Sequence, residues 1–145
     1  MKFNVYQKTI EMKNQIGIWV DTKKAVIISL KENETSIKTL ESAIEHRERF
    51  AGEKNQMGRF GEQSFEQEKH KDNKFKNQER LFLKEILSEI GGVDSIVLFG
   101  PAYVKNHLEK EIKSHRDISN KLVGVVTTDN MTKNQMSEWV NNYYH

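Results

Sequence analysis

The sequence predicts an α/β fold in which one mixed five-stranded sheet carries helices on its faces. Three apolar or alternating segments lie close together near the beginning of the chain, at residues 16–20, 25–30 and 35–40. Strands this close in sequence pair as antiparallel hairpins. Helical patterns then alternate with two apolar runs, at residues 95–99 and 121–126, as in units whose parallel strands are joined by right-handed crossovers.

Each strand has a pattern that indicates its place in the sheet. Residues 16–20 are nearly all apolar, which is typical of a central strand covered on both faces. Residues 35–40 alternate between polar and apolar types, as a strand with one exposed face does. The runs at 95–99 and 121–126 are continuously apolar, so we expect both of these strands to be buried.

Three helices are expected after the third strand. The first has apolar residues at spacings of seven and four, namely Phe75, Phe82, Ile86 and Ile90, which form one helix face. The second presents Val104, Leu108 and Ile112. The last can be capped by Thr132 and carries Met136, Trp139, Val140 and Tyr143. The resulting order, β-β-β-α-β-α-β-α, is that of a ribonuclease-H-like fold.

A polar stretch from about Glu41 to Lys74 separates the third strand from the first helix. Connections in compact domains usually have about 4–6 residues, and much longer ones are usually functional or disordered. Residues 46–80 contain nine cations and seven anions, with Phe50, Phe60 and Phe65 among them. Such rings either anchor a loop to its domain or stack on RNA bases. We therefore expect one domain, residues 1–145, with a functional loop at residues 41–74.

The composition excludes several classes of function. The chain has no cysteine, which excludes disulfides, thiolate zinc sites and a cysteine nucleophile. Its 23 basic and 21 acidic residues do not argue for nucleic acid by net charge alone. No apolar run approaches the roughly 18 residues that span a bilayer, and no secretion signal is present. We expect a cytoplasmic protein with no membrane partner, no cofactor and no metal.

The ribonuclease-H-like layout nevertheless leaves a metal-dependent nuclease as an alternative. Such enzymes hold two metal ions on carboxylates, one of which projects from the first strand. Asp21 follows that strand, but Gly100 and Pro101 follow the fourth strand without a carboxylate, and Asp129 is the only late candidate. Because aspartate is common in turns, the favoured interpretation of Asp21 is a turn residue.

The order of four motifs resembles the middle domain of the archaeal and eukaryotic class I release factors. The resemblance covers residues 16 to about 144. It rests on the strand at 16–21, the segment Gly58-Arg59-Phe60-Gly61-Glu62-Gln63-Ser64, the strand at 96–99 with Gly100, Pro101 and Lys105 after it, and the run at 122–127. In that family the second motif is a loop carrying Gly-Gly-Gln, which reaches the peptidyl-transferase centre of the ribosome.

The resemblance implies a ribosome-directed, translation-associated protein that binds rRNA or the acceptor end of tRNA. Gly61 and Gln63 match the first glycine and the glutamine, and are the candidate catalytic residues. Glu62 departs from the family's middle glycine, which reaches backbone conformations that glutamate reaches only at a cost, and this favours binding without hydrolysis, as in a rescue or dormancy factor. The candidate RNA-binding residues are Arg47, Arg49, Lys54, Arg59, Ser64, Lys69 and Lys71.

Three alternatives stay open beside this interpretation. The chain could hydrolyse peptidyl-tRNA, act as the metal nuclease described above, or fold its loop on a separate protein partner. Because 145 residues leave no room for the codon-reading and GTPase-recruiting domains of release factors, we expect a single-domain bacterial relative of that family.

Overall fold

The computed structural model describes residues 13–32, 34–44 and 61–145, and its strands form one sheet. The elements are β1 (Gln15–Val20), β2 (Lys24–Lys31), β3 (Glu34–Glu41), α3 (Gly61–Ser88), β4 (Ser95–Gly100), α4 (Val104–Ser114), a short 3-10 helix η1 (Ser119–Lys121), β5 (Leu122–Thr127) and α5 (Lys133–Tyr144). The strand order is β3-β2-β1-β4-β5. β1, β2 and β3 pair antiparallel, whereas β4 is parallel to both β1 and β5. The predicted α/β class and mixed five-stranded sheet are confirmed.

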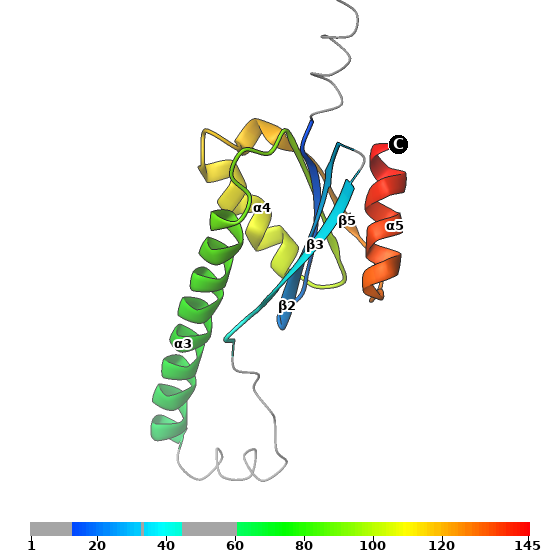
Figure 1. The fold of residues 1–145 in the computed structure, drawn as a ribbon. Helices are drawn as coiled ribbons and strands as arrows, with labels where there is room; N and C mark the ends of the chain where they lie inside the picture. Colours follow the sequence, from blue (N-terminus) through cyan, green and yellow to red (C-terminus); the bar gives the residue numbers. More distant parts are fainter. Residues whose placement is uncertain (1–12, 33, 45–60) are drawn as a thin grey trace, which may run out of the picture.

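Helices cover both faces of this sheet, with α3 and α4 on one side and α5 on the other (Figure 1). The alternation of side chains along β1 explains the two layers. Ile16, Ile18 and Val20 belong to the apolar cluster beneath α3 and α4. Trp19 belongs to a second cluster with Met136 and Val140 of α5. β1 is the middle strand of the sheet, as its continuous apolar run predicts.

The prediction that the last strand is buried was wrong. β5 is an edge strand, most of its residues are partly exposed, and the side chain of Val123 is 52% exposed. An apolar run shows that a strand is compatible with burial, but it does not show whether a further strand will pair beside it. The strand order of the sheet decides that point.

Helix α5 lies close against β1. The position of Gly17 leaves no room for a side chain, since an added Cβ would lie 2.3 Å from Cγ2 of Val140. Thr132 caps the helix as predicted, because its hydroxyl accepts from the N–H of Gln135 and the Gln135 side chain accepts from the N–H of Thr132. This reciprocal pair satisfies two of the free N–H groups at the start of the helix.

Helix α3 begins 14 residues before the apolar pattern that predicts it (75 − 61 = 14). Phe75 does mark the start of the described side chains that pack on the core, followed by Phe82, Leu83 and Ile86. The predicted loop boundary at Lys74 was therefore wrong, since the backbone is helical from Gly61. Glutamate, glutamine and lysine are good helix formers, and they dominate residues 62–71. Apolar periodicity marks only the part of a helix that packs on a core.

Residues 61–74, which we call the arm, run past the edge of the sheet (Figure 1). Neither α3 nor any other helix among the described residues is long and apolar enough to cross a membrane.

Candidate functional site

The structure places one group of the predicted site residues at the beginning of the arm. The first turn of α3 consists of Gly61, Glu62, Gln63 and Ser64, and two predicted cations follow on the same helix, Lys69 and Lys71. The remaining predicted RNA-binding residues lie outside the described residues: Arg47, Arg49, Lys54 and Arg59. Residues 61–63, which resemble the Gly-Gly-Gln motif, therefore form the start of α3. This is the end of the helix that lies farthest from the sheet (Figure 1).

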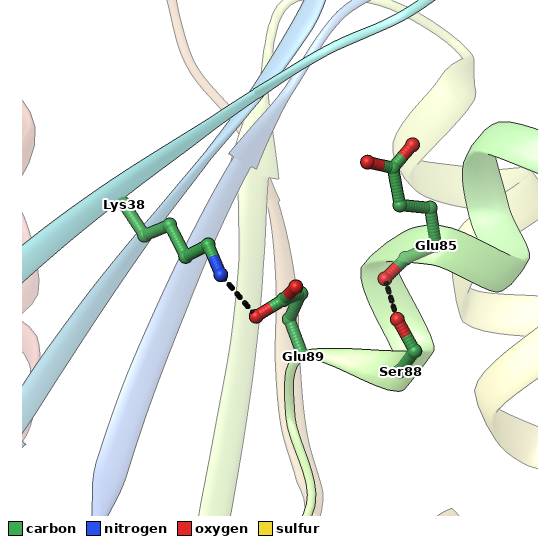
Figure 2. Close-up of polar contacts among 4 residues, drawn as sticks. All are labelled: Lys38, Glu85, Ser88 and Glu89. Carbon is green, nitrogen blue, oxygen red and sulfur yellow. Dashed lines mark hydrogen bonds and ion pairs between the residues drawn. The ribbon is translucent and has the colours of Figure 1, made fainter.

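The other end of α3 is fixed to the sheet. Nζ of Lys38, on β3, donates to Oε2 of Glu89 at 2.5 Å (Figure 2). The hydroxyl of Ser88 donates to the carbonyl oxygen of Glu85 at 2.6 Å, which satisfies one of the free carbonyls in the last turn of the helix. The Lys38–Glu89 pair therefore ties the end of α3 to the edge strand.

A second tether joins the middle of α3 to α4. Glu79 is only 7% exposed, and its Oε1 contacts Nδ1 of His107. The ring of Tyr103 lies edge-on to His107, with 5.1 Å between the ring centroids. Burial, and to a smaller extent the charge of Glu79, raises the pKa of the Tyr103 phenol. Together with the core contacts of Phe82 and Ile86, the two tethers hold the packed part of α3 against the domain.

The turn between β4 and α4 requires a glycine and is stabilised by a lysine. Gly100 has φ +141°, and a Cβ there would lie 2.6 Å from the carbonyl oxygen of Val20. Lys105 is 4% exposed, and its ammonium donates to the carbonyl oxygen of Ala102 at 3.0 Å. The lysine that contributes to the family resemblance is thus bonded to its own turn rather than displayed on the surface.

Asp21 is a turn residue, as favoured from the sequence. Its Oδ1 accepts from the backbone N–H groups of Lys23 and Lys24, both at 2.8 Å. This contact stabilises the β1–β2 turn. Within the described part of the chain, no three histidine, aspartate or glutamate side chains are grouped so that they could hold a metal ion.

Sequence reasoning missed one feature, which is a line of cations on α3. Lys76, Arg80 and Lys84 follow one another at intervals of four and are exposed. The interval places them on one face of the helix. The spacing of these cations can be read from the sequence. Recognising them as one exposed face also requires knowing which face of α3 packs on the core.

Comparison with solved structures finds a similar fold at low sequence identity. No family model matches the sequence, and no curated protein matches it. Pelota from Archaeoglobus fulgidus superposes with a TM-score of 0.55 at 9% sequence identity, over 97% of this chain and 34% of that chain. Pelota from Thermoplasma acidophilum gives 0.47 at 12% identity, over 96% and 36% of the two chains. An archaeal translation termination factor gives 0.45 at 17% identity, over 97% and 42%.

The similarity to the first of these structures shows a shared fold. This chain spans about a third of the length of that protein. The more specific correspondence with the middle domain of the release factors stays a prediction.

Proposed function

We propose that this chain is a ribosome-directed RNA-binding protein that presents the start of α3 to rRNA or to the acceptor end of tRNA. The observation that carries the proposal is the arm. Residues 61–74 of α3 precede the first described contact with the core, at Phe75, and a helix of that length extends about 20 Å. A projecting helix can bring a short segment into a site that the body of the domain cannot enter.

The residue types on the arm, and in the segment before it, suit contact with RNA. Gly61, Gln63 and Ser64 match the family's loop in order, and the predicted phosphate-binding cations lie on both sides of that segment in sequence: Arg47, Arg49, Lys54, Arg59, Lys69 and Lys71. Cations bind the phosphate backbone and position a protein on RNA. The fold shared with Pelota is compatible with the proposal, although the shared fold alone does not identify a function.

Co-sedimentation of the full chain with purified 70S ribosomes at two salt concentrations tests the proposal. We expect binding that weakens with salt and is abolished by R47E/R49E/R59E. The matched control is K31E/R116E/K133E, which changes the net charge equally at three exposed positions on β2, after α4 and on α5. Absence of wild-type binding at low salt would refute the proposal, as would equal loss of binding in both variants.

Hydrolysis of peptidyl-tRNA is a second candidate function, favoured by the match of Gly61 and Gln63. The helical backbone at residue 62 is a conformation that every L-residue adopts, so Glu62 is not strained in this structure. If Glu62 alone prevents hydrolysis, E62G should create or increase release of the peptide from ribosome-bound peptidyl-tRNA, with G61A/E62G as the control. No increase would count against this activity.

A further inference from the structure

Three cations stand in line on one face of the packed part of α3. Lys76, Arg80 and Lys84 are exposed and stand four residues apart, so consecutive members are separated by about 6 Å along the helix axis. We call these three residues the basic stripe. The side chains that fix α3 to the domain, among them Phe82 and Ile86, belong to its other face.

Within the described residues, the cations of the basic stripe have no ion-pair partner. None of the three side chains forms an ion pair or hydrogen bond with another described residue. Two nearby carboxylates have other partners, since Glu79 contacts His107 and Glu89 contacts Lys38. Asp72 lies four residues before Lys76, and Glu85 follows Lys84 directly.

The arrangement also works against the stability of the helix. Arg80 has a like charge four residues away in both directions, at Lys76 and Lys84, and such pairs destabilise a helix. No acidic residue lies three or four positions from Arg80 or Lys84. Three cations at this spacing repel one another, and an anionic partner would relieve that repulsion.

We propose that the basic stripe binds the phosphate backbone of RNA, an inference that rests on the proposed function and extends it to the packed part of α3. The charges are evenly spaced on a rigid helix, which suits a polymer that carries one charge per nucleotide.

The test compares the full chain with K76Q/R80Q/K84Q in binding to 70S ribosomes and to protein-free rRNA, at several salt concentrations. Each phosphate contact contributes about 0.7–0.9 to the slope of log affinity against log salt. We expect the variant to lose about 2–3 from that slope and at least about tenfold in affinity at low salt. Its Tm should be unchanged or slightly higher, since glutamine forms helices well and the repulsion is gone.

The matched control K31Q/R116Q/K133Q removes the same charge from exposed positions away from α3, and it should keep at least two thirds of the wild-type slope. Wild-type binding with equal slopes in the stripe and control variants would overturn the inference while leaving the proposed function standing. Failure of the wild type to bind ribosomes, with stripe-dependent binding to rRNA, would instead overturn the proposed function alone.

An acidic protein is the other polyanion that could occupy this face. Leu81 is 61% exposed on α3, so a protein docked on this face would bury its side chain. Ribosome binding that L81A weakens as strongly as the stripe variant, with no binding to protein-free rRNA, would show a protein partner and overturn the RNA assignment. Unchanged rRNA binding by L81A supports it.

Discussion

A methyl group added at Gly17 tests how closely α5 packs on the sheet. In Gly17→Ala the new Cβ would lie 2.3 Å from Cγ2 and 3.1 Å from Cγ1 of Val140. Rotation of the valine does not relieve the overlap, because β-branched residues in helices keep one χ1 rotamer and the Cβ of Val140 is itself 3.3 Å away. β1 is held by β2 and β4, so α5 must move outward.

Overpacking of this kind costs about 1–3 kcal/mol, and the short distance places Gly17→Ala in the upper half of that range. For a chain of this size the Tm should fall by about 5–10 °C. Val140→Ala alone should cost about 2 kcal/mol, for two lost methyl groups and a small cavity.

The decisive measurement is a double-mutant cycle by urea unfolding. G17A/V140A should be less destabilised than the sum of the single variants by at least about 1 kcal/mol, because the alanine at position 140 makes room for the new methyl group. Additive effects, or a neutral Gly17→Ala, would refute the close-packing argument. All three variants should bind ribosomes with wild-type affinity when folded, since this face lies opposite α3.

Three further outcomes follow from individual contacts. Burial, with a smaller effect of Tyr143, raises the pKa of Tyr144 from 10.0 to about 12, so the free energy of unfolding should stay constant below about pH 10 and fall as the pH rises towards 12, which urea unfolding across this range measures. Tyr144→Phe lacks the 2.7 Å hydrogen bond to the carbonyl oxygen of Ile16 and should cost about 1 kcal/mol. The same variant should no longer lose stability between about pH 10 and 12. His107→Ala leaves the buried carboxylate of Glu79 unpaired and should cost about 1.5 kcal/mol in urea unfolding, with a loss below 0.3 kcal/mol arguing against the tether. Gly100→Ala meets both an unfavourable φ and a backbone carbonyl, so a cost of about 2 kcal/mol or more in thermal unfolding is expected, and a wild-type Tm would contradict it.

Most of the packed fold could be predicted because it leaves a periodic pattern in the sequence. The alternation in residues 35–40 and the spacing of Phe82, Ile86 and Ile90 record which side chains meet the core. Thr132 could be identified as a helix cap because capping depends on residues within one turn. Each of these signals is local, so the sequence is sufficient to show it.

The candidate site could be predicted only in part. From the sequence, the segment Gly61–Ser64 is a candidate site through its resemblance to the release factors, but the sequence did not show that this segment begins a helix. Polar residues can form a projecting helix or a loop with the same absence of apolar periodicity. Glutamate, glutamine and lysine favour a helix here, but propensity is too weak a signal to decide between the two.

By itself, the sequence determined the number, type and order of the packed elements, because burial leaves a periodic record in residue type. Only the tertiary structure decided that β5 is an edge strand and that Lys76, Arg80 and Lys84 are exposed and form no ion pair with another described residue. Those properties depend on which residues from distant parts of the chain come together, as when Glu79 meets His107 and Glu89 meets Lys38. These contacts occupy one face of α3, and no local pattern in the sequence records which face that will be.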